Sequence, residues 1–198
     1  EDFHREEAKG AKVFGVREVG ALILSQAGRA LEKQIRPKRQ WVLMAGESAG
    51  RLAPDWDALR PIVPPRDVYW ADPMGIVREG RLQILVEEYV YKTRRGRIAC
   101  LTLDEQERVT SNQVALERPY HLSYPFVFEH RGETYMIPET ASRRAVELYR
   151  CTRWPDSWEF VHALMSGIYA VNSTLLNFNG RWWLFTNVKG ESDASSWD

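Results

Sequence analysis

The chain of 198 residues carries 27 basic and 27 acidic side chains and therefore has no formal net charge. A balanced charge provides no global field toward nucleic acid or an anionic membrane, and no apolar run is long enough to span a bilayer. The length suffices for one good-sized domain. The 8 Trp, 8 Tyr and 7 Phe suit either broad apolar packing or stacking against sugars.

The N-terminal part of the chain is predicted to be a linker followed by a strand and a loop. Apolar residues recur at helical spacing from Glu18 to Ile35, and Pro37 ends that run. We therefore expect a linker helix, with residues 1–38 forming a linker or the tail of an upstream domain. Residues 40–44 resemble a strand that closes a ring of blades, and residues 46–66 resemble a long loop.

One pattern occurs three times in the remainder of the chain: a strand, a tight turn ending in glycine, and a returning strand that stops on a polar residue. The turn glycines are Gly80, Gly132 and Gly180, at intervals of 52 and 48 residues. Two-residue loops of this kind form β-hairpins, because glycine adopts the positive φ angle that they need. A strand repeat with a period near fifty is typical of a β-propeller, in which each blade buries its faces against its neighbours.

Two of the copies continue into further strands. The first continues through residues 96–101 and 114–116, and the second through residues 145–149 and 158–161. Four strands per repeat is the blade of a propeller. The third copy holds one hairpin, so we expect residues 39–198 to be an all-β propeller with about three blades present, and the chain to be a piece of a longer protein.

The hairpin turns also predict which polar residues face each other. Counting back from two-residue loops pairs Asp72 with Glu87 in the first copy. The same counting gives the pairs Tyr124–Glu139 and Asn172–Asn187 in the other copies. Propeller symmetry would bring all six residues to one mouth of the central channel.

These six residues have the chemistry of a sugar site. Adjacent carboxylates raise one another's pKa, which is one way to make a general acid. Carboxylate, amide and phenol groups also match sugar hydroxyls, which both donate and accept. The set lacks the arginine cluster that a phosphate would need. We therefore expect a neutral or amino sugar, with Asp72, Glu87 and Glu139 favouring a cationic amine. The alternative is that Asp72 and Glu87 bind backbone amides or arginines at the blade ends.

Longer motifs give the sequence a family resemblance. They are Trp70-Ala71-Asp72-Pro73, Glu87-Glu88-Tyr89, Arg118-Pro119-Tyr120-His121-Leu122-Ser123-Tyr124-Pro125-Phe126, Met136-Ile137-Pro138-Glu139-Thr140 and Gly180-Arg181-Trp182-Trp183-Leu184-Phe185-Thr186-Asn187. Over about residues 40–198 the chain resembles the N-terminal domain of plant glucosamine inositolphosphorylceramide transferases and its bacterial homologues. The resemblance implies a fused glycosyltransferase domain in plants, and often an upstream formyltransferase-like domain in bacteria.

The hairpin pattern also resembles the five-bladed propellers of glycoside hydrolase family 43, which implies five blades here. That family carries catalytic carboxylates at the start of the inner strand in three blades, acting as base, pKa modulator and acid. By position Asp72 matches the base, but the second and third positions hold Tyr124 and Asn172. Two of three carboxylates are thus missing where the pattern puts them. Glu87 and Glu139 are nearby substitutes to which no motif assigns a role.

Other candidate groups carry less chemistry. His121 precedes the second inner strand and either faces the channel or binds a loop carbonyl. We expect neither a metal nor a cofactor, because the sequence has no zinc-spaced cluster, phosphate loop or nucleophile elbow. Cys100 and Cys151 fit no metal or redox motif, which favours free thiols in a reducing, cytoplasmic compartment. We expect at least one of Trp182 and Trp183 in the core, and the basic cluster at residues 94–97 to be a solvated loop.

Three functions remain open. The first is a carbohydrate-recognising propeller domain of a glycan- or glycolipid-assembling transferase, with a sugar or glycolipid head group as ligand. The second is an active glycosidase or glycosyltransferase that uses Asp72 with Glu87 or Glu139 and binds substrate through Tyr124, His121, Asn172 and Asn187. The third is a structural scaffold for a fused catalytic domain. Nucleic acid is not expected as a partner.

Overall fold

The computed structural model describes residues 41–46 and 55–189. The chain divides into two units, Glu1–Arg39 and Gln40–Asp198, and all described residues belong to the second. The helix predicted over residues 18–35 lies outside the described residues. The predicted division into residues 1–38 and 39–198 stays a prediction.

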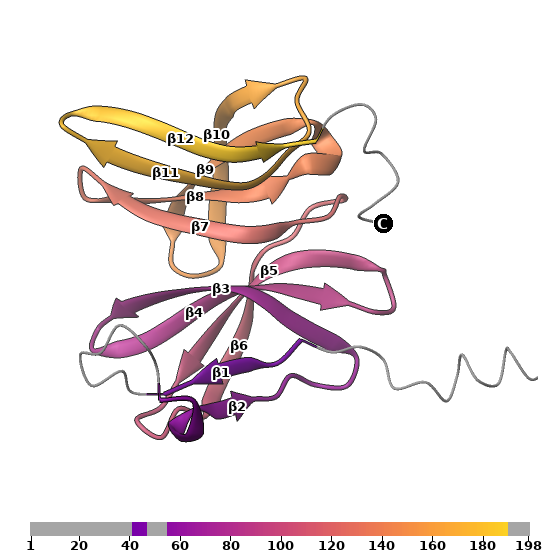
Figure 1. The fold of residues 1–198 in the computed structure, drawn as a ribbon, viewed down its shortest axis with the longest axis vertical. Coiled ribbons are helices and arrows are strands. Elements are labelled where there is room, and N and C mark those ends of the chain that lie inside the picture. Colours follow the sequence, from indigo (N-terminus) through magenta and orange to yellow (C-terminus); the bar gives the residue numbers. More distant parts are fainter. Residues whose placement is uncertain (1–40, 47–54, 190–198) are drawn as a thin grey trace, which may run out of the picture. The chain divides into compact units, whose positions relative to one another are not determined.

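Two four-stranded antiparallel sheets follow each other along the chain, each a simple up-and-down meander (Figure 1). The first sheet contains β3 (Val68–Arg78), β4 (Arg81–Val90), β5 (Arg95–Leu103) and β6 (Val109–Leu116). The second contains β7 (Ser123–His130), β8 (Glu133–Thr140), β9 (Ala145–Arg153) and β10 (Ser157–Ser166), with the 3-10 turn η2 (Ala141–Arg143) between β8 and β9. We refer to these sheets as blade 1 and blade 2.

A third copy of the inner hairpin follows, formed by β11 (Ala170–Phe178) and β12 (Arg181–Val188). Its strand β11 packs beside β7 and β8 of blade 2, while β7 packs beside β3 and β4 of blade 1. Repeated antiparallel meanders packed in sequence are the blades of a β-propeller, so the predicted all-β propeller is confirmed. The number of five blades in a complete ring stays a prediction.

The hairpin turns have the predicted geometry. Both central residues have positive φ in each turn: 52° and 72° at Glu79-Gly80, 51° and 80° at Arg131-Gly132, and 52° and 72° at Asn179-Gly180. A turn with positive φ at both central positions matches the twist of the paired strands. A Cβ added at any of the three glycines would meet no atom within 4 Å. Glycine is therefore needed here for its backbone conformation and not for space.

Three apolar layers alternate with the sheets. Leu85, Ile98, Leu122, Met136 and Tyr149 pack between blades 1 and 2, together with buried Cys100 and half-buried Cys151. A second layer, which includes Ile137, Val146, Leu148 and Ala170, lies between blade 2 and the β11–β12 hairpin. Burial on both faces explains why β4, β5 and β9 each contain four or five consecutive buried residues in place of an alternating pattern.

The third layer lies on the other face of blade 1 and corrects one sequence prediction. Strand β1 (Leu43–Ala45) pairs with β2 (Arg60–Ile62) in a separate two-stranded sheet of the described residues, and its closure of a ring of blades stays a prediction. Its Leu43 packs with Ile62 and Trp70 against blade 1. The segment predicted to be a long loop therefore contains a strand, and also the 3-10 turn η1 (Trp56–Ala58).

The β11–β12 hairpin corrects a second prediction. Trp182 and Trp183 are 45% and 48% exposed, so neither lies in the core, although one was expected there. Trp182 contacts Phe128 of blade 2, with 5.6 Å between ring centroids. In the described residues no further strand packs on the hairpin's outer face, which explains the exposure of Trp183, on the face opposite to Trp182.

Candidate functional site

Each inner hairpin contains a β-bulge at the same place, and the bulges carry three of the predicted site residues. Asp72, Tyr124 and Asn172 have φ of 49°, 42° and 54°, in the left-handed region. At each of these positions two residues of the first strand stand opposite one residue of the second. A bulge of this kind re-aims the side chain at the bulged position, and such bulges are common near active sites.

The bulges shift the predicted cross-strand pairs by one residue. Glu87 lies opposite Ala71, Glu139 lies opposite Ser123, and Asn187 lies opposite Val171. The predicted pairs Asp72–Glu87, Tyr124–Glu139 and Asn172–Asn187 are therefore wrong as direct pairs. The reason is physical: counting back from the turn assumes one residue opposite one, and a bulge adds a residue to one strand only.

The carboxylate of Asp72 reaches from blade 1 to blade 2. Its Oδ2 accepts a hydrogen bond of 3.2 Å from the backbone N–H of Tyr124. Burial raises the pKa of Asp72, while this hydrogen bond and the nearby His121 act in the opposite direction. The expected binding of a backbone amide by Asp72 is thus present, and it comes from the next blade.

Glu139 makes the same contact one blade further on. Its Oε2 accepts a hydrogen bond of 3.1 Å from the backbone N–H of Asn172 at the bulge of β11. Burial raises the pKa of Glu139, Asp72 raises it further, and the hydrogen bond from Asn172 lowers it. Blade 2 has a tyrosine at the bulge where blade 1 has Asp72, so a carboxylate from β8 serves in its place.

Glu87 is buried, and its carboxyl interacts electrostatically with both Asp72 and Glu139. Its Oε1 accepts from the Tyr69 hydroxyl at 3.4 Å and lies 3.4 Å from His121 Nε2. Burial, and then the charges of Asp72 and Glu139, raise the pKa of Glu87 to about 8. The carboxyl of Glu87 therefore holds a proton at neutral pH. We call Asp72, Glu87 and Glu139 the carboxylate cluster.

His121 is held against the cluster by a close approach of two segments. Its Nδ1 accepts a hydrogen bond of 2.9 Å from the backbone N–H of Gly96, the second residue of β5. Burial lowers the pKa of His121, so the ring is neutral and carries its hydrogen on Nε2, which points toward Glu87. A Cβ at Gly96 would lie 2.4 Å from the Leu122 carbonyl oxygen and 2.9 Å from Glu87 Oε1. Only glycine fits at this position.

Three tyrosines extend the site beside Glu87. Tyr69 and Tyr89 are directly opposite on β3 and β4, and their rings stack at 4.8 Å with an interplanar angle of 6°. Tyr91 meets both rings edge-on at 6.0 Å. All three are half-buried. Burial, followed by the charge of Glu87, raises the pKa of Tyr69 far above its usual range, so its hydroxyl stays a donor.

The remaining predicted site residues, Tyr124, Asn172 and Asn187, differ in their exposure to solvent and in their contacts. The Tyr124 hydroxyl lies 3.0 Å from Thr174 Oγ1 on β11, so its side chain reaches toward the third hairpin. Asn172 is exposed, and its backbone N–H is the group that binds Glu139. Asn187 is exposed on β12, and no hydrogen bond within the described part of the chain links its side chain to the carboxylate cluster.

Two other buried carboxylates are parts of the framework. Glu88 accepts from Trp70 Nε1 at 3.0 Å, from Asn112 Nδ2 at 2.8 Å and from Arg97 Nη2 at 2.7 Å, which ties all four strands of blade 1. Strand β5 begins at Arg95, so the prediction of a solvated loop over residues 94–97 is wrong for residues 95–97 and correct only for Arg94. Glu147 of blade 2 similarly accepts from the hydroxyls of Tyr149 on the same strand and Tyr120 in the β6–β7 loop.

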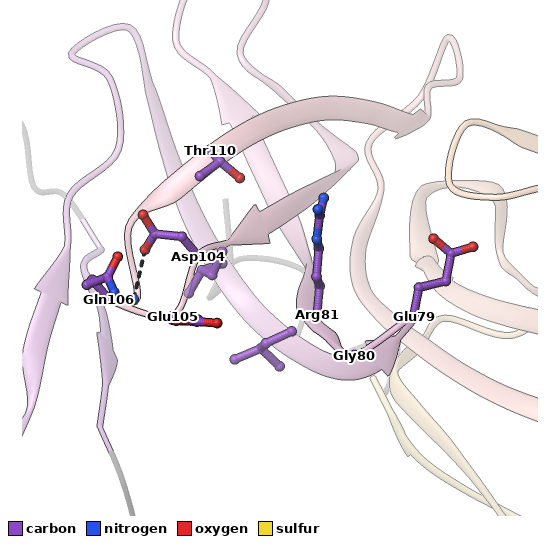
Figure 2. A pocket seen from close by; sticks show the side chains of 9 residues that line it. Glu79, Gly80, Arg81, Asp104, Glu105, Gln106 and Thr110 are labelled. Atoms are coloured by element: carbon purple, nitrogen blue, oxygen red, sulfur yellow. Dashed lines mark hydrogen bonds between the residues drawn. The ribbon is translucent and has the colours of Figure 1, made fainter.

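Two pockets of the described residues lie at the opposite ends of the strands. One is lined by the β3–β4 turn and the β5–β6 turn (Figure 2). Its Asp104 accepts hydrogen bonds from the backbone N–H groups of Gln106 and Arg108, so the carboxylate is held in its own turn. Another lies where the Arg78 guanidinium packs over the Trp154 ring, at 4.4 Å, between the two blades. Neither contains a predicted site residue.

The cluster's arrangement supplies both acceptors and donors within one small region. Protonated Glu87, neutral His121 and the Tyr69 hydroxyl donate, while the carboxylates of Asp72 and Glu139 accept. In the described residues, no group of three or more His, Cys, Asp and Glu is placed to hold a metal ion. None of the described helices has the length and apolarity required to cross a membrane.

Sequence reasoning missed Tyr69, Tyr89, Tyr91 and Gly96. Without the bulge, the predicted register places Tyr69 opposite Val90, which hides the Tyr69–Tyr89 pair. The signal that could have corrected it is proline within a strand, at Pro73 and Pro125, because proline inside sheets is confined to edges and bulges.

Comparison with known proteins identifies relatives in plants. A curated relative from Oryza sativa subsp. indica, glucosamine inositolphosphorylceramide transferase 1, is 34% identical over 118 residues. The protein of the same name from Arabidopsis thaliana is 32% identical over 117 residues. Each alignment covers 59% of this chain but only 16% and 15% of the relative, so the chain corresponds to a small part of those proteins.

A solved structure, an exo-1,5-alpha-L-arabinanase from a bovine ruminal metagenomic library, is similar with a TM-score of 0.48 and 13% identity. The similarity covers 76% of this chain and 60% of that one. The family model described as glucosamine inositolphosphorylceramide transferase 1, N-terminal, matches residues 64–196, which include both blades, the third hairpin and the whole carboxylate cluster. The chain therefore belongs to the family of the N-terminal domain of glucosamine inositolphosphorylceramide transferase 1.

Proposed function

We propose that this chain is the carbohydrate-recognising propeller domain of a glycan- or glycolipid-assembling transferase, and that the carboxylate cluster holds an amino sugar. The observation that carries the proposal is the convergence of Asp72, Glu87 and Glu139, from two adjacent blades, beside donors from Tyr69 and His121. The activity of the whole protein is part of the proposal, because the chain spans a small share of the length of its relatives.

An ammonium group explains why three carboxyls are grouped without a cationic side chain in direct contact. Asp72 and Glu139 each accept a backbone N–H, and Glu87 faces Tyr69 and His121. Their raised pKa values indicate that the free site is short of positive charge. A bound ammonium supplies that charge and restores the ionised form of each carboxyl. The relatives' name specifies glucosamine, which is a sugar of this class.

The tyrosines beside Glu87 suit the other surface of a sugar ring. Tyr69 and Tyr89 form a stacked pair with Tyr91 edge-on to it, next to the carboxyl that binds the Tyr69 hydroxyl. Aromatic rings offer large apolar area at low cost in side-chain entropy, and a phenol adds a polar handle. We assign the ring's apolar C–H face to these tyrosines and its amine to the carboxylates.

Calorimetric titration of the 198-residue chain with glucosamine, N-acetylglucosamine and glucose tests the proposal. We expect glucosamine to bind at least about 10-fold more tightly than the other two, because hydrogen bonds to charged groups contribute about 1.5–3 kcal/mol. Asp72→Asn and Glu139→Gln should each weaken glucosamine binding by a similar factor. Glu79→Gln is the matched control, because Glu79 is an exposed carboxylate in the turn at the opposite end of β3.

Two results would contradict the proposal. Equal affinity for the three sugars would remove the role of the amine. Absence of binding to any of them, with the chain folded, would favour a structural scaffold for a fused catalytic domain.

A second function is favoured by one observation, the protonated carboxyl of Glu87. A carboxylic acid with a pKa of about 8 is suited to general-acid catalysis at neutral pH. If a glycosidic bond is made or broken here, Glu87→Gln should abolish turnover and retain sugar binding. Unchanged turnover in Glu87→Gln would exclude Glu87 as the acid.

A further inference from the structure

The charges of this chain are sorted between the two ends of its strands, although the net charge is zero. Between β3 and β12, the turns at the end that carries the carboxylate cluster hold one Glu and five cations: Lys92, Arg94, Arg118, Arg143 and Arg144. The turns at the other end hold two Arg and five acids: Glu79, Asp104, Glu105, Glu107 and Asp156. We call the five cations the basic rim.

The turns that carry the basic rim are joined to one another. Arg95, the first residue of β5, donates from Nη1 to the Pro119 carbonyl at 2.9 Å, which links the β4–β5 turn to the β6–β7 loop. The Arg143 guanidinium lies over the Tyr120 ring at 5.4 Å, which links that loop to the β8–β9 turn. The backbone N–H of Ile168 donates a hydrogen bond of 3.1 Å to the Arg144 carbonyl, which links the β8–β9 turn to the β10–β11 loop. The rim is therefore a continuous edge across both blades.

Three cations of the rim are available to a partner. Lys92, Arg94 and Arg144 are exposed, and none of them forms an ion pair within the described part of the chain. At the opposite end, by contrast, Arg108 binds Asp104 at 2.8 Å and Arg153 binds Asp156 at 3.1 Å. Arg81, Arg131 and Arg181 at that end are also exposed without an ion pair in the described residues, but the turns there hold five acids. The excess of positive over negative turn residues therefore lies at the end that carries the carboxylate cluster.

We propose that the basic rim docks this domain onto an anionic bilayer surface, with the carboxylate cluster facing the lipid headgroups. Basic side chains near such a surface are attracted by its negative potential, and the attraction falls off within a Debye length. Tyr169 is half-buried in the β10–β11 loop at the same end, and tyrosine suits a membrane interface because one end of its side chain is apolar and the other is polar.

A bilayer fits this surface better than a nucleic acid does. A nucleic acid is a continuous chain of phosphates, and to contact cations on both blades it must pass close to Asp72, Glu87 and Glu139. The separate headgroups of a bilayer can contact the rim alone and leave the carboxylate cluster to a sugar or amine. The docking does not require the sugar site, so each can fail without the other.

Co-sedimentation of the 198-residue chain with vesicles tests the docking. We expect binding to phosphatidylcholine vesicles that contain about 30 mol% phosphatidylserine, weak binding to pure phosphatidylcholine, and loss of binding when salt is raised from about 0.1 M to about 1 M. The triple variant Lys92→Gln, Arg94→Gln, Arg144→Gln should weaken binding to the anionic vesicles by about 100-fold, from about fivefold per cation.

The matched control removes the same charge from the opposite end, in the triple variant Arg81→Gln, Arg131→Gln, Arg181→Gln. All three arginines are exposed. This control should retain vesicle binding within about fivefold, the effect of one cation. An equal loss in both triples, or no preference for the anionic vesicles, would overturn the proposal. So would tighter binding to a DNA duplex or to inorganic phosphate than to the anionic vesicles.

Discussion

The carboxylate of Asp72 in blade 1 accepts a hydrogen bond of 3.2 Å from the backbone N–H of Tyr124 in blade 2. Both residues are in the left-handed conformation at equivalent bulges. Glu139 and Asn172 repeat the contact between blade 2 and the third hairpin, at 3.1 Å. The carboxylates of the candidate site therefore also join successive blades, which links binding to the stability of the fold.

Removal of the Asp72 carboxylate should destabilise the chain. Asp72→Ala leaves the Tyr124 N–H without its acceptor, which costs about 1–3 kcal/mol for a buried donor. Asp72→Asn keeps an oxygen acceptor and tolerates positive φ, so it should retain most of the stability. Urea denaturation of the two variants measures the difference. Equal stabilities for Asp72→Ala and Asp72→Asn would show that the hydrogen bond to Tyr124 contributes nothing.

The raised pKa of Glu87 predicts a loss of stability with increasing pH. In the unfolded chain Glu87 ionises near its ordinary pKa of 4.5, whereas in the folded chain it keeps its proton up to about 8. Between these values the folded state binds more protons, so the free energy of unfolding falls as pH rises. Glu87→Gln cannot ionise and should lose less stability between about pH 5 and 8.

Melting temperatures measured across this pH range test the prediction for Glu87. Asp72 and Glu139 have raised pKa values too, so part of the decrease of stability with pH should remain in Glu87→Gln. Glu133→Gln is the control, since a hydrogen bond from Tyr135 lowers the pKa of Glu133 and moves its titration below the window. The same slope in wild type and Glu87→Gln would mean that Glu87 is ionised at neutral pH.

Gly96 should tolerate no side chain. In Gly96→Ala the new Cβ meets the Leu122 carbonyl and Glu87, so the segment that carries His121 has to move. We expect a loss of about 1–3 kcal/mol, as for other overpacked sites. Gly75→Ala is the control, because its Cβ would lie 3.7 Å from the nearest atom, a Leu82 methyl. Chemical denaturation compares them, and equal stability of both variants would refute the close approach.

How much the sequence predicts depends on whether a feature is local. The hairpin turns at Gly80, Gly132 and Gly180 were predicted correctly, because a two-residue loop with glycine determines its own geometry. The blades followed from the spacing of those turns. The cross-strand pairs were wrong, because the bulge falls at Asp72 itself and moves every residue from that point on to another partner.

The candidate site was predicted in part, because the repeat is visible in the sequence and the contacts between blades are not. Asp72, Glu87 and Glu139 do interact, because the repeat brings equivalent strand positions to one end. The hydrogen bonds from one blade to the next depend on blade packing, which no local pattern encodes. Gly96 was missed because its role is to let the segment of His121 and Leu122 approach β5, a contact between residues 25 apart in sequence.

The third hairpin should make the 198-residue chain prone to self-association. Trp183, Phe185 and Phe178 are 48%, 56% and 60% exposed, and contiguous exposed apolar surface favours association. Light scattering across a concentration series should show oligomers that Trp183→Lys reduces. Trp56→Lys is the control, since Trp56 is 75% exposed in η1 and far along the chain from the hairpin. A concentration-independent monomer with a sharp, reversible melt would contradict this prediction.

Backbone amide chemical shifts recorded during a titration with glucosamine test the amino-sugar site most directly. The N–H groups of Tyr124, Asn172 and Gly96 bind Asp72, Glu139 and His121 respectively, so their shifts report on the site itself. We expect these three amides to shift together with a single dissociation constant, while Gly80, Gly132 and Gly180 at the opposite end stay unchanged. Shifts confined to the glycine turns, or none at saturating glucosamine, would contradict an amino-sugar site at the carboxylate cluster.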